Sequence, residues 1–180
     1  MTVLDSEHEC IRFARLAIQE YYSLTELITE PDFANWNKIL LEQSDFEDFL
    51  IGRNAKLNLL NTMVIVGLGI DKAISNPIQD HCQSLLLKLN TYLEALPTLK
   101  KDKKFRDKIK NLEGYNFLST LSELSMANWF SNLGFRIEFE TKFRQSTSGK
   151  NRDVDLTITD KLGNIVHFEV YMPNGYFTSK

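Results

Sequence analysis

Two acidic residues in the last third of the chain are of the types, and at the positions, that suit binding of a hard metal ion. Asp155 belongs to one apolar segment, residues 154–159, and Glu169 belongs to another, residues 165–171. Both segments read as β-strands, and alternate residues of a strand share one face. We expect Asp155 and Glu169 to bind Mg²⁺ or Mn²⁺ through one carboxylate each, with the main-chain carbonyl of Val170 as a third oxygen ligand.

Such an ion supplies a recognisable chemistry. A bound divalent cation polarises a phosphate group and lowers the pKa of an attacking water molecule, which is what phosphodiester hydrolysis requires. The strand of Glu169 is expected to be central in the sheet, where its carboxylate needs a metal, a base or a partner charge. Strand alternation adds Asp153 beside Asp155 and His167 beside Glu169. The alternative is that Asp153 and Asp155 only solvate the start of a hairpin strand.

The elements around these residues predict an α+β protein, with a helical region over residues 1–114 and a nuclease-like α/β unit over residues 115–180. Up to Leu133 the apolar residues recur every three or four positions, and Gly and Pro are sparse, which indicates a string of helices. Residues 135–141 then alternate with period two. Further on, Gly163-Asn164 favours a hairpin turn between two more strands. A helix followed by a three-stranded β-meander results.

The helical region offers several boundaries. The apolar residues between Ile11 and Tyr21 predict a first helix that Pro31-Asp32 breaks, where Asp32 can cap the next one. Leu57–Ile74 predicts a strongly apolar and therefore central helix. A further helix starts at Asn76-Pro77 and runs to the break at Pro97. The second segment carries these apolar residues: Ile39, Leu40, Phe46, Phe49 and Leu50.

The order of these elements resembles the PD-(D/E)XK nuclease superfamily, which has the restriction-endonuclease-like fold. The resemblance rests on Glu123-Leu124-Ser125-Met126-Ala127 on the helix, Leu133-Gly134-Phe135 at the helix-to-strand turn, Asp155 in the second strand and Glu169-Val170-Tyr171 in the third. It covers about residues 116–173. It implies a metal-dependent nuclease that acts on DNA or RNA phosphodiester bonds.

The family's core implies a further helix and a fourth strand after the third strand. The chain ends at Lys180, nine residues after Tyr171, before these elements. The expectation is therefore either that the sequence is a fragment or that helices of the N-terminal region cover the sheet.

The resemblance also assigns catalytic roles, and one position departs from the family. Tyr171 stands where the family usually has a lysine, and a neutral phenol can only form hydrogen bonds. An active enzyme would need a substitute cation, for which Lys150 and Lys142 are candidates. His167 could instead position a water molecule while neutral. The departure puts catalytic activity in doubt.

Glu123 matches the helix glutamate that the family uses as an outer-shell metal ligand. Its spacing from Ala127 and Phe130 places it on a flank of the helix near the buried face. The alternative is that Thr120 and Glu123 form a capping box at the start of a helix.

Charge is distributed unevenly along the chain. Residues 1–99 carry 7 Lys and Arg against 14 Asp and Glu, whereas residues 100–180 carry 14 against 10. Much of the basic excess lies in residues 100–110, a run that either contacts phosphates or forms the solvated face of a basic helix. The predicted nucleic-acid contacts are Lys100, Lys101, Lys103, Lys104, Arg106, Lys142, Arg144 and Arg152.

Other classes of protein find little support. The longest apolar stretch, residues 63–70, is far shorter than a membrane span, and no secretory leader is visible, which predicts a cytoplasmic protein. Cys10 and Cys82 lack zinc-ligand spacing and are expected to be buried or half-buried thiols. Residues 66–70 contain only two of the three glycines of a dinucleotide-binding loop.

Three hypotheses for function remain. The first is a Mg²⁺- or Mn²⁺-dependent nuclease. The second is a catalytically inactive nuclease-like module that binds nucleic acid or a protein partner. The third is a helical assembly protein that pairs, for example as a homodimer, through its N-terminal helices. Asp155 and Glu169 on opposite faces of the sheet would favour the third.

Overall fold

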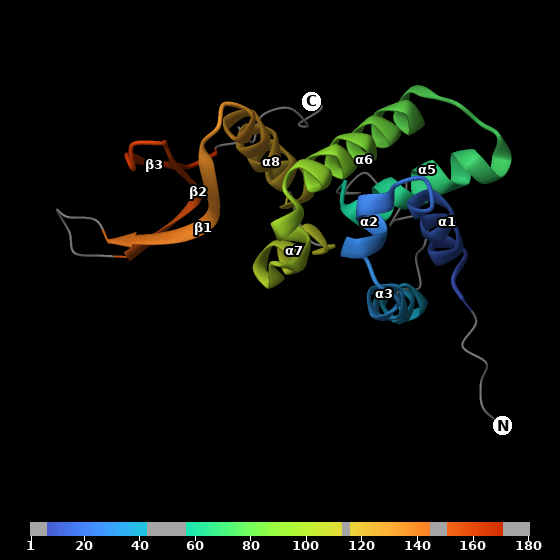
Figure 1. Ribbon diagram of the computed structural model, residues 1–180. Coiled ribbons are helices and arrows are strands. Elements are labelled where there is room, and N and C mark those ends of the chain that lie inside the picture. Colours follow the sequence, from blue (N-terminus) through green and yellow to red (C-terminus); the bar gives the residue numbers. More distant parts are fainter. Residues whose placement is uncertain (1–6, 43–56, 113–115, 145–150, 171–180) are drawn as a thin grey trace, which may run out of the picture. The chain divides into compact units, whose positions relative to one another are not determined.

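The computed structural model describes residues 7–42, 57–112, 116–144 and 151–170 (Figure 1). The chain divides into two compact units, residues 1–118 and 119–180. The boundary predicted between residues 114 and 115 lies outside the described residues. Helices precede a three-stranded antiparallel sheet, which confirms the predicted α+β class with a helical N-terminal region.

The first unit begins with three helices, which are α1 (Glu9–Ile18), α2 (Tyr22–Leu27) and α3 (Glu30–Glu42). The prediction of one helix up to Pro31-Asp32 is wrong, because α1 ends at Ile18. Tyr21 has an extended backbone, with φ −131° and ψ 92°, and so separates α1 from α2. Pro31 lies in the first turn of α3, where its missing N–H costs nothing.

Asp32 does cap α3, but from inside the helix. The main-chain N–H and the hydroxyl of Thr29 donate to Asp32 Oδ2 at 2.7 and 2.8 Å. Lys110 Nζ lies 2.6 Å from the same oxygen, and its side chain is only 11% exposed. Burial alone would raise the pKa of Asp32, but the hydrogen bonds from Lys110 and Thr29 outweigh it and hold the pKa below its ordinary value. This ion pair ties the start of α3 to a residue 78 positions later.

Replacing Asp32 with asparagine should lower the free energy of unfolding by about 1–3 kcal/mol at neutral pH, since a partly buried charged hydrogen bond is lost. The folded pKa is depressed, so the carboxylate's contribution is present above its ordinary value of 3.8 and is lost as the pH falls through the folded pKa. Urea unfolding near pH 7 and near pH 3 measures this difference, with the exposed Asp107→Asn as control. A difference that does not shrink on acidification would contradict the assignment.

The helix α5 (Leu59–Lys72) is the centre of the first unit, as predicted. It packs against both α1 and α6, and Asn58 caps it by accepting the Asn61 N–H at 2.9 Å. A Cβ added to Gly67 would lie 1.9 Å from the main-chain oxygen of Phe13 in α1. Gly67 therefore allows the two helix backbones to approach closely, and it belongs to a helix rather than to a nucleotide-binding loop.

The rest of the first unit follows the predicted boundaries. The helix α6 (Pro77–Ala95) starts after Asn76, whose side chain accepts the N–H groups of the first turn. A short 3₁₀ helix, η1 (Pro97–Lys101), follows, and Asp102 then caps α7 (Lys103–Ile109). The predicted core positions Phe46, Phe49 and Leu50 lie outside the described residues. The buried face of α6 is made by Cys82, Leu85, Leu86, Leu89 and Leu93.

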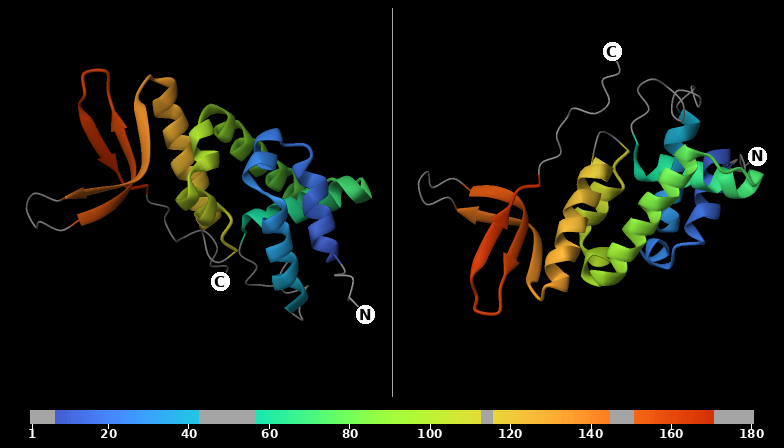
Figure 2. Two further views of the ribbon diagram at one scale, coloured as in Figure 1. Left: turned by 60° about the horizontal axis from the view of Figure 1, so that its bottom comes forward. Right: turned by 90° about the horizontal axis from the view of Figure 1, so that it is seen from above.

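The second unit contains most of α8 (Asn116–Asn132) and the strands β1 (Arg136–Arg144), β2 (Asn151–Thr159) and β3 (Ile165–Phe168) (Figure 2). The order β1-β2-β3 with antiparallel pairing confirms the predicted helix and meander. Among the described strands β2 is central and β3 is at the edge. The prediction of a longer and central third strand containing Glu169 is therefore wrong.

The two faces of this sheet have different surroundings. Leu156 pairs with Phe168, whose ring centre lies 5.1 Å from that of Phe130 on α8. These residues belong to the face that α8 covers, and Leu156 is fully buried. Thr157 and His167 pair on the other face, which we call the polar face. Alternation assigns Asp155 to the polar face as well, because it lies next to Leu156 and two residues from Thr157.

The turn between β2 and β3 is organised by Asp160. Its Oδ1 accepts the N–H groups of Leu162 and Asn164, each at 2.8 Å, and its Oδ2 accepts from the Asn164 amide at 2.7 Å. Gly163 has a φ of 88°, which disfavours other residues. The hydrogen bonds from Asn164 lower the pKa of Asp160. The hairpin expected at Gly163-Asn164 is confirmed.

Candidate functional site

The end of β3 is attached to β2 by a side chain. β3 ends at Phe168, but the Val170 N–H donates to Asp155 Oδ2 at 2.7 Å, which keeps the chain beside β2. The β2–β3 register, continued by one residue, sets Glu169 opposite Asp155. The side chain of Asp155 is half-buried and that of Glu169 is exposed. The residues predicted as metal ligands are therefore neighbours in the fold.

Strand alternation gives these two residues the same face of the sheet. Asp155 lies between the buried residues Val154 and Leu156, and Glu169 follows Phe168, whose ring packs on α8. Both acidic residues are thus assigned to the polar face. The register therefore does not place Asp155 and Glu169 on opposite faces, which is the arrangement that would favour the helical assembly protein.

The donor set here suits a hard cation. Asp155 Oδ1, the Glu169 carboxylate and the Val170 carbonyl are all oxygen ligands, the type that Mg²⁺ and Mn²⁺ prefer. Within the described parts of the chain, no three Asp, Glu, His or Cys side chains form a group that could hold a metal ion. A cation at this position would therefore rest on two carboxylates, a main-chain carbonyl and water.

Glu123 is a buried residue of α8. Its side chain is 3% exposed, and its Oε1 accepts from the Ser119 hydroxyl at 3.1 Å. The helix α8 begins at Asn116, four residues before Thr120, so the alternative of a capping box that starts the helix is wrong. A buried carboxylate on α8 agrees with the predicted flank near the buried face.

The remaining predicted residues of the second unit fall into two groups. Tyr171 and Lys150 lie outside the described residues. In the backbone register of β1 and β2, Lys142 pairs with Asp153, two residues before Asp155. Three basic positions of this unit are predicted to contact nucleic acid, and they lie toward the Asp153 end of the β1–β2 ladder: Lys142, Arg144 and Arg152.

The basic run of the first unit is partly engaged in ion pairs. Lys100 pairs with Glu26 and its side chain is only 14% exposed. The bond from Lys100 lowers the pKa of the Glu26 carboxyl. Arg106 is half-buried. The exposed cations among the predicted contacts of this run are Lys101, Lys103 and Lys104.

Both cysteines are buried free thiols, as predicted. Burial, with a smaller effect of Glu9, raises the pKa of Cys10 to about 12. Burial also raises the pKa of Cys82 to about 11. Thiols that stay protonated at neutral pH are poor nucleophiles and poor metal ligands, so these residues serve the core.

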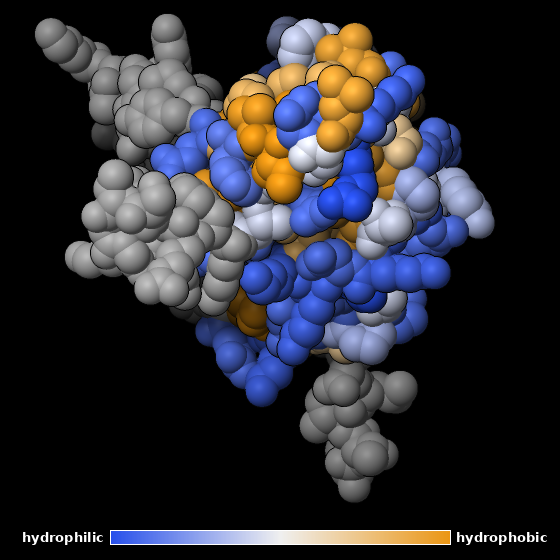
Figure 3. Space-filling model, turned by 60° about the vertical axis from the view of Figure 1, so that its left-hand side comes forward, coloured by the Kyte–Doolittle hydropathy of each residue, from blue (hydrophilic) through white to orange (hydrophobic). Residues whose placement is uncertain are grey.

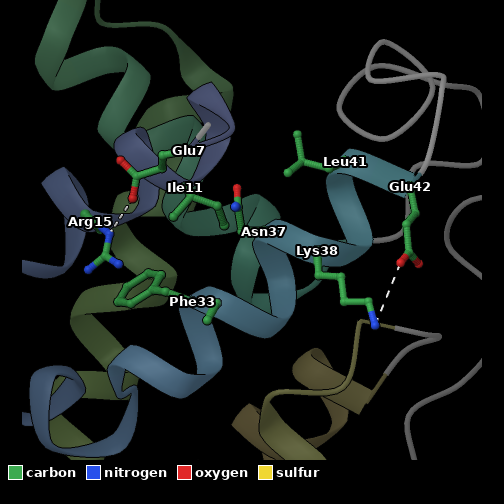
Figure 4. A pocket seen from close by; sticks show the side chains of 9 residues that line it. Glu7, Ile11, Arg15, Phe33, Asn37, Lys38, Leu41 and Glu42 are labelled. Carbon is green, nitrogen blue, oxygen red and sulfur yellow. Dashed lines mark hydrogen bonds and ion pairs between the residues drawn. The ribbon is translucent and has the colours of Figure 1, made fainter. Parts of the chain in front are cut away.

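A hollow of about 660 Å³ lies in the first unit between α1 and α3 (Figure 4). Arg15 lines this hollow and pairs with Glu7 at 2.8 Å and with Glu30 at 2.5 Å. Its guanidinium carbon lies 4.4 Å from the centre of the Phe33 ring. The hydrogen bond to Glu30 is the largest of the effects that raise the pKa of Arg15. None of the predicted site residues lines this hollow.

Apolar side chains also reach the surface, and Figure 3 shows one face on which they lie among charged ones. In the second unit, Leu162 is 88% exposed at the hairpin turn, and Ile165 and Val166 on β3 are exposed as well. Across the described helices, none is long and apolar enough to cross a membrane.

The candidate residues therefore lie in three places: an acidic pair where β2 meets the end of β3, a buried glutamate on α8, and basic positions on β1 and β2. Of these, the structure directly joins Asp155 to the Glu169-Val170 segment. In comparisons with known proteins, no family model, no curated protein and no solved structure matches this chain.

Proposed function

We propose that the second unit is a nuclease-like module in which Asp155 and Glu169 bind Mg²⁺ or Mn²⁺ and act on a DNA or RNA phosphodiester. One observation carries the proposal. The Asp155 carboxylate holds the Val170 N–H at 2.7 Å and so keeps the Glu169 main chain beside β2. Two carboxylates at neighbouring positions on one face of the sheet favour a divalent cation between them.

Asp155, Glu169 and Glu123 would have different roles in binding the cation and the nucleic acid. When bound, the cation supplies Lewis acidity to a phosphate oxygen and to water. Asp155 Oδ2 accepts the Val170 N–H, and Oδ1 of the same carboxylate would bind the cation, so strand geometry and ligand geometry would be coupled through one side chain. Glu169 is exposed and accessible to a polymer. Buried Glu123 would act in support, the role that the resemblance gives it.

Basic groups would position the nucleic acid through its phosphates. In the second unit these are Lys142, whose backbone pairs with Asp153, and Arg144 and Arg152, which lie further toward the same end of the β1–β2 ladder. The exposed residues Lys101, Lys103 and Lys104 of the first unit offer a separate set of phosphate contacts. Lys150 and Tyr171 complete the proposed set by resemblance, with Lys150 as the substitute for the missing lysine.

Cleavage assays test this function with single-stranded DNA, duplex DNA and RNA as substrates. The intact protein should cut at least one of them with Mg²⁺ or Mn²⁺ and not with chelator. Glu169→Gln, which removes the charge and keeps the shape, should reduce the rate by at least about a hundredfold, since a metal ligand is lost. Glu138→Gln, an exposed residue of β1, is the matched control and should retain the rate. Equal cutting by the intact protein and Glu169→Gln would contradict the proposal.

A second candidate function is a catalytically inactive module that binds nucleic acid or a protein partner. The observation in its favour is the exposed apolar edge formed by Ile165 and Val166 on β3 with Leu162 beside them. Exposed apolar residues on an edge strand suit pairing with another chain. Nucleic-acid binding that is indifferent to chelator, with no cutting by any protein, would favour this function. We also propose a homodimer formed through the helices of the first unit as one such protein partner.

A further inference from the structure

The C-terminal half of α8 exposes a face without charged side chains. Glu123 is the only charged residue in the sequence of the whole helix, and it is buried. An exposed helix face ordinarily carries charged or other strongly polar groups. The exposed residues of this face follow one another at helical spacing and continue one position beyond the helix: Ser125, Trp129, Asn132 and Leu133. The face therefore offers neutral polar and apolar groups to a partner.

Trp129 is the residue of this face that the fold explains least. Its side chain is 60% exposed, whereas Trp36, the other tryptophan of the chain, is buried. The Trp129 ring centre lies 4.8 Å from that of Phe130, and the two rings are tilted by 54°. A large flat ring that is supported by a second ring and still exposed suits stacking with another aromatic group. The packing of the second unit thus accounts for only part of the indole surface.

Two ring contacts join Trp129 to the strand end that carries Glu169. The Phe130 ring lies between, at 4.8 Å from the Trp129 ring and 5.1 Å from the Phe168 ring. Phe168 directly precedes Glu169 in the chain. Phe168 belongs to the face that α8 covers and Glu169 to the polar face, so β3 separates them, and β3 is at the edge of the described sheet. A polymer that passes this edge can contact both Trp129 and Glu169.

Two basic side chains lie near the C-terminal end of α8. A Cβ added to Gly134 would lie 3.9 Å from Lys161 Nζ, so this ammonium group is close to the turn that follows the helix. Arg136 begins β1 and is exposed, although it pairs with Glu138 at 3.0 Å. Cations beside an exposed aromatic ring are typical of surfaces that bind single-stranded nucleic acid. Protein interfaces instead are depleted of charged residues at their apolar core. The surroundings of Trp129 therefore favour nucleic acid over an apolar protein surface.

We propose that Trp129 stacks against an unpaired base, and that the nucleic acid bound by the second unit is therefore single-stranded. The inference rests on the proposed function, because it names the form of nucleic acid that the same unit takes. Bases of a duplex are stacked on their neighbours, so a ring on a helix surface selects strands whose bases are free to turn outward. Lys161 and Arg136 contact phosphates next to the stacked base. The strand then continues past the β3 edge to Asp155 and Glu169.

Tryptophan fluorescence of the full-length protein tests the stacking directly, because a base that stacks on an indole quenches its emission. A single-stranded oligonucleotide, added in the presence of chelator so that no cation takes part, should lower the emission of the intact protein. The chain contains only two tryptophans, so Trp129→Phe leaves the buried Trp36 as the sole emitter. The emission of this variant should not respond to the oligonucleotide. Equal quenching in both proteins, or none in the intact protein, would overturn the inference.

The affinity for a dye-labelled oligonucleotide, again in chelator, measures how much the stacking contributes. Trp129→Ala should weaken binding of the single strand at least about fivefold, the lower end of the loss for one stacked base. Trp129→Phe should lose less, because it keeps a ring. A duplex of the same length should bind the intact protein and Trp129→Ala equally. Tyr22→Ala removes an exposed aromatic residue of the first unit and is the matched control, with a change of less than about twofold.

The outcomes separate this inference from the nuclease proposal. Single strands that bind the intact protein and Trp129→Ala equally would overturn the stacking, even if metal-dependent cleavage is found. An equal loss for single strands and duplex would overturn the selection of unpaired bases. No binding by the intact protein would overturn the inference as well and would leave this face of α8 for a protein partner. Binding that depends on Trp129 in a protein that cuts no substrate would support the inference and contradict only the nuclease activity.

Discussion

Gly67→Ala is expected to reduce the free energy of unfolding of the first unit by about 2–3 kcal/mol. The new methyl group would sit 1.9 Å from the Phe13 carbonyl oxygen and 2.5 Å from its carbon, both main-chain atoms of α1. Main-chain atoms cannot rotate away, so α1 and α5 must separate, and we expect a cost of about 3–4 kcal/mol, at or above the upper end of the usual range for overpacking. The better helix propensity of alanine offsets about 1 kcal/mol of that cost.

Gly69→Ala on the same helix is the matched control. There the added methyl group meets the side chain of Gln79, which can move, with 1.7 Å to its amide nitrogen. We expect a change within about 1 kcal/mol, because the gain in helix propensity compensates the rearrangement. Fluorescence of Trp36, which is 3% exposed, follows unfolding of this unit once the exposed Trp129 is replaced with phenylalanine. Equal destabilisation by both alanines would show that the contact with Phe13 does not matter.

The second large effect concerns Asp155, which has two tasks that substitution can separate. Asp155→Asn keeps an oxygen that accepts the Val170 N–H but loses the negative charge. It should lower Mn²⁺ affinity by at least about tenfold while the Val170 amide stays protected from hydrogen exchange. Asp155→Ala should lose both the affinity and the protection, since nothing replaces the 2.7 Å hydrogen bond.

Asp153→Asn provides the control for these measurements. Asp153 is an exposed carboxylate on β2, two residues from Asp155 and on the same side of the strand. Its removal changes the local charge by the same amount and should alter Mn²⁺ affinity less than threefold in calorimetric titration. Equal losses for Asp153→Asn and Asp155→Asn would mean that the cation responds only to the general negative charge of the face.

Much of the fold could be predicted from sequence periodicity. The change from helical spacing to alternation after Leu133 located the end of α8 and the start of β1, and Asn76-Pro77 located the start of α6. These signals are local, because each depends on the propensity of a few consecutive residues. The break between α1 and α2 carried no Gly or Pro, and the extended backbone of Tyr21 was therefore missed.

The site was harder to predict, because its decisive contacts join distant residues. The register that sets Asp155 opposite Glu169 follows from the hairpin at Gly163-Asn164, a signal the sequence contains. The hydrogen bond that retains the chain after Phe168 joins Val170 to the Asp155 side chain, 15 residues away, and no local pattern reports it.

The most direct test of the account is to map where Mn²⁺ binds. Paramagnetic Mn²⁺ added in small amounts to the ¹⁵N-labelled protein broadens the amide signals of nearby residues. The account predicts that broadening is strongest at Asp155, Glu169 and Val170 and disappears there in Asp155→Asn. Broadening centred elsewhere in the chain, or an unchanged pattern in Asp155→Asn, would contradict a cation site at the β2–β3 edge.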